Sequence, residues 1–175
     1  MIRNAVNEAL VDSLHDDMTA KIACFLRSIG LAVRTAKIAG PTVLPGIQPD
    51  RGVLFFDPEK LRFPGDLLHE AGHLAVKPAA DLEQTPSDLG GDPAEEMMAI
   101  AWSYAAAVHL QIPIEVLFHA EGYRGGSQSL IDNFAAGRFL AVPMLQWIGM
   151  TCDEKRAREI GIDPYPHMVK WLRDC

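Results

Sequence analysis

Cysteine is scarce in this sequence of 175 residues, which has only Cys24, Cys152 and Cys175. These residues are widely separated and form no C-x-x-C pair, which argues against both a disulfide framework and a zinc site built on cysteines. Without a disulfide pattern, the expected location of the protein is the reducing cytoplasm.

Positive charge is also in short supply, because 16 Lys and Arg residues against 23 Asp and Glu residues give a net charge of −7. An acidic chain matches the phosphate backbone poorly, so we expect no nucleic-acid partner. Long apolar runs are missing, and the N-terminus has no basic segment followed by an apolar one. We therefore expect neither a membrane span nor a signal peptide. The length and the 49% hydrophobic content are typical of a single globular domain over residues 1–175.

The sequence does contain the pattern H-E-x-x-H, from His69 to His73, inside an apolar stretch. Residues four apart lie on the same face of a helix, so both imidazoles can point at one metal ion. Two imidazoles, a carboxylate and an open position are typical of catalytic zinc, which makes Zn²⁺ the expected cofactor. Glu70 is about 100° further round the helix, where it can act as a general base on a water at the metal. The alternative, polar residues on a partly exposed helix face, is disfavoured by the apolar neighbours.

Residues around the motif predict the limits and the packing of its helix. Asp66 is expected to cap the N-terminus, and Lys77-Pro78 to follow the last turn. Gly72 lies inside the helix, where glycine costs about 1 kcal/mol relative to alanine. We interpret Gly72 as a point of close approach by another backbone, in preference to a tolerated surface glycine.

The segment before the motif is expected to form a helix over residues 6–29 and two short strands, 31–39 and 52–56. Between the strands, residues 41–50 contain three prolines and a glycine, and a surface loop is expected there. The strand at Val53–Phe56 could hold an extended peptide through main-chain hydrogen bonds, or it could be an ordinary core strand.

A second helix is predicted to begin at Asp92-Pro93 and to run to about Leu110. Asp92 has the residue type of an N-cap, and proline is favoured at the first helical position. Glu95, three residues after Asp92, completes the pattern of a capping box.

A catalytic zinc site needs a third protein ligand. No histidine follows His73 at the longer metzincin spacing, which leaves the acidic residues Asp88, Asp92, Glu95 and Glu96. The capping box accounts for Asp92 and Glu95, so we choose Glu96, with Glu95 as the next candidate. The alternative role for Glu96 is a carboxylate that stabilises the N-terminus of its helix.

The last third of the chain is expected to form a helical layer against the core. Its short helices are predicted within residues 113–119, 128–136, 153–160 and 164–172. A glycine-rich turn separates the first two, and Tyr123, His119 and Arg124 flank it as possible stabilisers of an oxyanion. A half-buried aromatic, a core histidine and a surface arginine are equally good readings of these three residues.

The motif and the second helix together resemble the ImmA/IrrE-type zinc metallopeptidases. The second motif of that family has a glutamate, an alanine three residues on, an aromatic and a small residue, and finally a proline. Here these residues are Glu96, Ala99, Trp102-Ser103 and Pro113, and the resemblance covers roughly residues 31–113.

The resemblance implies an α+β fold: a compact zincin-like domain with a small sheet, an active-site helix and a mainly helical C-terminal layer. It implies a zinc-dependent peptidase in which His69, His73 and Glu96 bind the metal and Glu70 is the base. Better-known members of the family cleave transcriptional repressors, so the expected partner is a peptide or protein substrate, regulatory proteins included. The alternative is a non-catalytic zinc-binding regulatory or sensor protein on the same scaffold.

Overall fold

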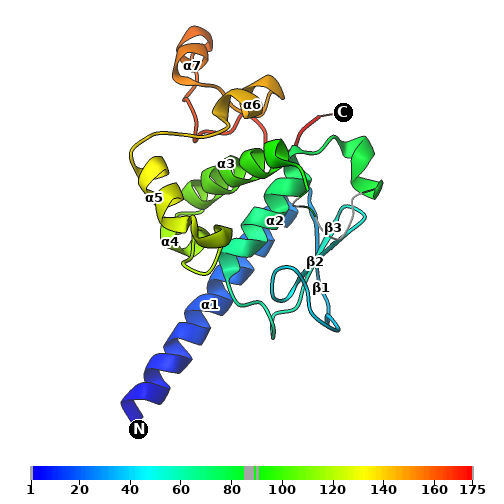
Figure 1. The fold of residues 1–175 in the computed structure, drawn as a ribbon, viewed down its shortest axis with the longest axis vertical. Coiled ribbons are helices and arrows are strands. Elements are labelled where there is room, and N and C mark those ends of the chain that lie inside the picture. Colours follow the sequence, from blue (N-terminus) through cyan, green and yellow to red (C-terminus); the bar gives the residue numbers. More distant parts are fainter. Residues whose placement is uncertain (1, 85–88, 90, 175) are drawn as a thin grey trace.

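The computed structural model describes residues 2–84, 89 and 91–174, with side chains from residue 15 onward, and has a mixed α+β fold (Figure 1). Its helices and strands are, in chain order, α1 (Ile2–Ser28), β1 (Ala32–Thr35), β2 (Ile47–Asp50), β3 (Val53–Phe56), α2 (Pro64–Val76), α3 (Pro93–His109), α4 (Ile114–Leu117), α5 (Ser127–Ala135), α6 (Val142–Trp147) and α7 (Glu154–Ile160). Two 3-10 helices, η1 (Ala79–Gln84) and η2 (Tyr123–Gly125), complete the description. Among the described residues, no helix combines the length and the apolarity needed to span a membrane.

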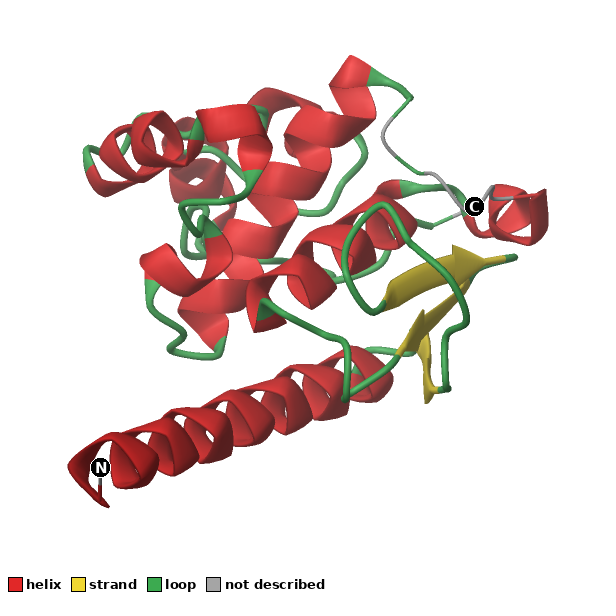
Figure 2. Ribbon diagram, turned by 60° about the horizontal axis from the view of Figure 1, so that its bottom comes forward, coloured by secondary structure: helices red, strands yellow, loops and turns green. Residues whose placement is uncertain are grey.

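The sheet lies at one side of the helices and has the strand order β1-β3-β2 (Figure 2). Strand β3 pairs in parallel with β1 and antiparallel with β2, so both of its edges are occupied. Of the two readings of Val53–Phe56, the structure therefore supports the core strand, because β3 is central and has no free edge for a peptide. The surface loop expected over residues 41–50 is present only in residues 41–46, because β2 forms at Ile47–Asp50. Pro49 is tolerated in β2 because an edge strand has a side where a missing N–H breaks no ladder bond.

Helix α2 carries the H-E-x-x-H motif and packs closely against α3. The closeness depends on Gly72: a Cβ atom built there would lie 2.8 Å from the carbonyl oxygen of Ala99 in α3. The predicted close approach of another backbone is thus confirmed. Because α3 crosses at this point, the residues in its first turn lie beside the motif.

The start of α2 differs from the expectation that Asp66 caps it. The N-cap is Phe63, which has no side-chain cap bond, and Pro64 is the first helical residue. Proline is favoured at that position because the first helical N–H has no partner within the helix. Asp66 is therefore inside the first turn, where it is buried and hydrogen-bonded to His119.

The C-terminal third contains the expected short helices α4, α5 and α7, but no helix over residues 164–172. That segment is a strap held by backbone hydrogen bonds, including one from Val169 to Met150 and one from Arg173 to Ala75 in α2. Pro164 and Pro166 lack the N–H groups that a helix needs, which favours this irregular path of turns and bends.

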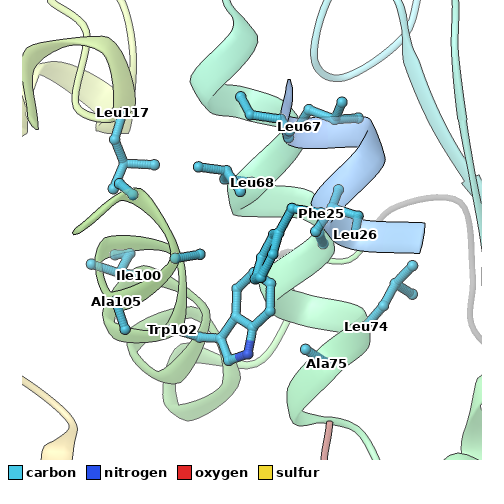
Figure 3. Packing of buried hydrophobic residues seen from close by; sticks show 14 of the residues in the cluster. Phe25, Leu26, Leu67, Leu68, Leu74, Ala75, Ile100, Trp102, Ala105 and Leu117 are labelled. Carbon is cyan, nitrogen blue, oxygen red and sulfur yellow. The ribbon is translucent and has the colours of Figure 1, made fainter. Parts of the chain in front are cut away.

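The core lies between α1, α2 and α3 (Figure 3). Figure 3 shows Phe25 and Leu26 of α1 facing Leu68 of α2 and Trp102 of α3. Trp102 has no exposed surface, and its indole N–H donates to the carbonyl of Trp171 in the C-terminal strap at 2.9 Å. The same apolar contacts that bury these side chains fix α2 and α3 against each other and so determine the geometry between them.

Candidate metal centre

The two histidines of the motif lie one turn apart on α2 and face the first turn of α3. The His69 and His73 side chains are 12% and 1% exposed, and their ring centroids are 4.9 Å apart. Across from them, the Glu96 carboxylate lies 3.5 Å from His69 Nε2 and 3.1 Å from His73 Nε2. One potential ligand atom from each of the three residues falls within a group no wider than 4.8 Å. The structure thus brings together the three residues that the sequence predicts as metal ligands.

Glu95 has a different partner from the one that the sequence predicts. Asp92 does cap α3, but its carboxylate accepts from the N–H of Ala94. The Glu95 side chain points to α2, where its carboxylate lies 3.1 Å from His73 Nδ1 and also accepts a hydrogen bond from Lys77. The capping-box role of Glu95 is therefore wrong. The Glu95 carboxylate pairs with Nδ1 of His73 instead of the backbone N–H of Asp92, because the buried imidazole nitrogen has no access to water and needs a partner within the protein.

Of the other ligand candidates, Asp92 is exposed at the start of α3, and Asp88 lies outside the described residues.

The charges at this cluster favour a neutral His69. Burial, and then the neighbouring His73, lower the pKa of His69 to about 4, and its Nδ1 atom is buried without a hydrogen-bond partner. Burial also opposes charge on His73, but hydrogen bonds and proximity to Glu96, Glu70 and Glu95 outweigh it and raise the pKa. The hydrogen bond with His73 is the largest cause that lowers the pKa of Glu96. At neutral pH the cluster thus has an uncharged His69 imidazole and an ionised Glu96 carboxylate, both next to the His73 ring.

A cavity of about 490 Å³ opens at the cluster. One wall is apolar and is formed by Val43, Leu44, Ile47, Pro49 and Leu89, from β2 and the loops beside the sheet. The opposite wall is the glycine-rich turn, residues 121–124. Glu70 is half-buried between the walls, and it is close enough to contribute to the raised pKa of both His73 and Tyr123. A bound molecule would therefore meet the metal-ligand cluster and the Glu70 carboxylate together.

Tyr123 has an unusual position in the glycine-rich turn. Its ring contacts His69 edge-on, with 5.3 Å between centroids, and its hydroxyl is buried without a hydrogen-bond partner. Burial, and then the carboxylates of Asp66, Glu96 and Glu70, raise the pKa of this hydroxyl well above its usual range. The phenol therefore keeps its proton at any ordinary pH, and it can donate a hydrogen bond beside the histidines.

The backbone of the turn is strained. Tyr123 and Arg124 have φ angles of +52° and +50°, a region that costs a residue with a side chain about 1–3 kcal/mol. Ser127 holds the turn by donating from its hydroxyl to the carbonyl oxygens of His119 and Gly122. Strain of this kind concentrates at functional sites, and here it directs two consecutive side chains to one cavity.

His119, another of the three residues considered for an oxyanion role, does not line the cavity. Its Nε2 is 2.8 Å from the Asp66 carboxylate, and its ring stacks on Phe63 with 3.7 Å between centroids. Asp66 lines the cavity, whereas His119 does not. The pair joins the start of α2 to the base of the turn, an arrangement that no local sequence pattern indicates because 53 residues separate the partners.

Comparisons with protein-family models, with curated proteins and with solved structures found no match to this chain.

Proposed function

We propose that this chain is a zinc-dependent metallopeptidase with a zincin-like fold, similar to the ImmA/IrrE-type enzymes. The observation that carries the proposal is the convergence of His69, His73 and Glu96 at the floor of a cavity that also contains Glu70. Two ligand atoms on one tetrahedral zinc ion are about 3.3 Å apart, as follows from Zn–N and Zn–O distances of about 2.0–2.1 Å. The distances from His69 Nε2 to Glu96 Oε1, 3.5 Å, and from His73 Nε2 to Glu96 Oε2, 3.1 Å, are close to this spacing, and the ligand atoms of the three residues lie within 4.8 Å of one another.

The donor set also fits zinc chemically. Imidazole binds metal only when it is neutral, and the lowered pKa of His69 keeps it so. The Glu95 carboxylate beside His73 Nδ1 favours a proton on that nitrogen, which leaves the lone pair of Nε2 available on the side of Glu96. Zinc held by such a set supplies Lewis-acid polarisation of a carbonyl and acidifies bound water.

The roles of the other residues follow from their positions in the cavity. Glu70 accepts the proton of the attacking water and passes it to the leaving amine. The Tyr123 hydroxyl, which keeps its proton and has no partner of its own, donates to the negative oxygen that develops on the scissile carbonyl. Burial of that hydroxyl strengthens the interaction, because the local dielectric is low.

An extended peptide is the substrate shape that suits the cavity. Strand β2 is at the edge of the sheet and contributes Ile47 and Pro49 to the cavity wall. A peptide added along β2 would run past the metal centre with its side chains against the apolar wall. We therefore infer a peptide or protein substrate, with regulatory proteins as candidates through the family resemblance, in a reducing cytoplasm.

The proposal is tested by metal content and by hydrolysis. The protein, loaded with Zn²⁺ and desalted, should retain about one zinc ion per chain by elemental analysis, and His73→Ala should lose it. Glu70→Gln should retain zinc and the fold but not cleave a peptide library that the wild type cleaves, because an amide does not accept the proton. A folded wild type that emerges without metal would refute the zinc site. A zinc-loaded wild type that cleaves nothing would favour the non-catalytic sensor.

A further inference from the structure

Among the described residues that line the cavity, Arg124 differs from the other charged groups in its pairing. Asp66 pairs with His119, and Glu121 pairs with Arg62 at 2.8 Å. Arg124 lines the same cavity, yet it forms no hydrogen bond or ion pair with any residue that the structure describes. Arg124 contributes electrostatically to the lowered pKa of Glu96, after the larger effect of the His73 hydrogen bond. Among the described residues, no carboxylate forms an ion pair with this guanidinium group.

The position of Arg124 is set by the fold. Its backbone has the left-handed conformation, φ +50° and ψ 36°, directly after Tyr123 at φ +52°. Tyr123 lines the cavity from the same turn, and its hydroxyl is buried without a hydrogen-bond partner. The turn thus places at one cavity two adjacent side chains whose hydrogen-bond donors have no acceptor among the residues that the structure describes.

We propose that Arg124 binds a carboxylate of the substrate beside the scissile bond. This inference rests on the proposed peptidase function and names the substrate class: a peptide with a carboxylate near the cleavage point. At neutral pH the anionic groups of an unmodified peptide are carboxylates, and a guanidinium binds a carboxylate with two parallel hydrogen bonds. The carboxylate is either the C-terminus of the peptide or an acidic side chain. In the first case the enzyme removes C-terminal residues, and in the second it cleaves next to Asp or Glu.

This role differs from stabilising the oxyanion of the reaction. Arg124 is exposed, whereas the Tyr123 hydroxyl is buried beside His69. A donor to the oxyanion would act on every substrate alike. A carboxylate-binding residue acts only on ligands with the carboxylate.

The test uses small zinc-binding probes and measures affinity instead of turnover. A dipeptide with an N-terminal succinyl hydroxamate is prepared as the free acid and as the C-terminal carboxamide. In a second pair of probes, both C-termini are carboxamides, and the last residue is Glu in one probe and Gln in the other. Dissociation constants are measured by calorimetry on the full zinc-loaded chain, at neutral pH and low ionic strength.

Wild type should bind at least one acidic probe about fivefold more tightly than its neutral match, the upper end of the effect of an exposed charge pair with good bidentate geometry. Arg124→Gln should abolish this preference and leave the affinity for the neutral probe within about twofold, because the hydroxamate reports on the metal centre. Arg62→Gln is the matched control: it removes an arginine that is paired with Glu121 at the same cavity, and it should keep the preference. A preference within the first pair of probes identifies the C-terminus of the peptide as the source of the carboxylate, and a preference within the second pair identifies an acidic side chain.

The outcomes separate the two proposals. If the neutral probes bind and wild type shows no preference for either acid, the role of Arg124 is refuted while the metal centre stands. A preference that survives Arg124→Gln, or one that Arg62→Gln also removes, refutes it as well, because another group or the general field then accounts for it. If no probe binds to zinc-loaded protein, the proposed function fails and the role of Arg124 fails with it.

Discussion

Replacing Glu95 by alanine distinguishes the residue that orients a ligand from the residue that binds the metal. In the structure the Glu95 carboxylate lies 3.1 Å from Nδ1 of His73, whose side chain is only 1% exposed. Without Glu95, that nitrogen has no acceptor and no access to water, which costs about 1–3 kcal/mol of stability. Lys77 loses its partner as well. The expected loss of unfolding free energy is therefore larger than the loss of a helix cap.

The same change should weaken zinc binding. The Glu95 carboxylate fixes the orientation of the His73 ring and favours a proton on Nδ1, and removal of such a partner typically weakens metal affinity by about 10–100-fold. Glu96→Ala removes a ligand and should weaken it further. Asp92→Ala is the control, because it removes only the cap on the N–H of Ala94. It should cost about 1 kcal/mol and leave zinc affinity unchanged.

Two measurements on each variant decide the question: chemical denaturation of the zinc-free protein, and zinc titration against a chelator. If Glu95→Ala behaves like Asp92→Ala in both, the contact with His73 has no role in metal binding and the reasoning fails. If Glu95→Ala weakens zinc binding more than Glu96→Ala, the two carboxylates have been assigned in the wrong order.

Two further predictions concern packing and ionisation. In Gly72→Ala the gain in helix propensity is about 1 kcal/mol, whereas overpacking against the Ala99 carbonyl costs about 1–3 kcal/mol. The variant should therefore be less stable than the wild type in thermal unfolding. Displacement of α3 should also weaken zinc binding. Gly91→Ala, where an added Cβ meets nothing within 4 Å, should do neither. Burial raises the pKa of Tyr165 well above 10, so its contribution to stability is complete below the unfolded-state pKa near 10 and is lost as the pH rises beyond it. Tyr165→Phe loses the 2.9 Å hydrogen bond to the Ala101 carbonyl and should be less stable than the wild type at neutral pH. As the pH rises above 10, however, its unfolding free energy should decline less steeply than that of the wild type. An equal slope for the two proteins would contradict this prediction.

Local patterns were sufficient to predict the helices that build the site. Spacing by four placed His69 and His73 on one face of α2, and Asp92-Pro93 marked the start of α3. The glycine in the middle of α2 indicated the close approach of a second backbone, which proved to be Ala99 of α3. Each of these predictions depends on residues within a few positions of one another, where backbone geometry fixes the relative placement of side chains.

Features that depend on distant partners were predicted wrongly or not at all. Strand β2 forms in a proline-rich segment because β3 offers it an antiparallel partner, and the central place of β3 is a property of the strand order. Asp66 has the residue type of a cap, but Pro64 begins the helix two residues earlier and His119 takes the carboxylate. The apolar wall of the cavity, which includes Val43 and Leu44, also follows from the fold of the sheet and left no signal in the sequence.

The choice of Glu96 over Glu95 rested on a capping box that does not form, yet the structure places Glu96 in the cluster. The reason lies in the shape of imidazole. Its two nitrogens point in diverging directions, and Glu95 and Glu96 diverge by about 100° on α3. One carboxylate therefore meets Nδ1 of His73 at 3.1 Å while its neighbour meets Nε2 of the same ring at 3.1 Å. A single ring buried between α2 and α3 thus accounts for both consecutive glutamates: Glu95 contacts one nitrogen, and Glu96 contacts the nitrogen on the side of the proposed metal. A helix cap needs only one carboxylate of this pair, whereas the proposed function of His73 as an oriented metal ligand uses both.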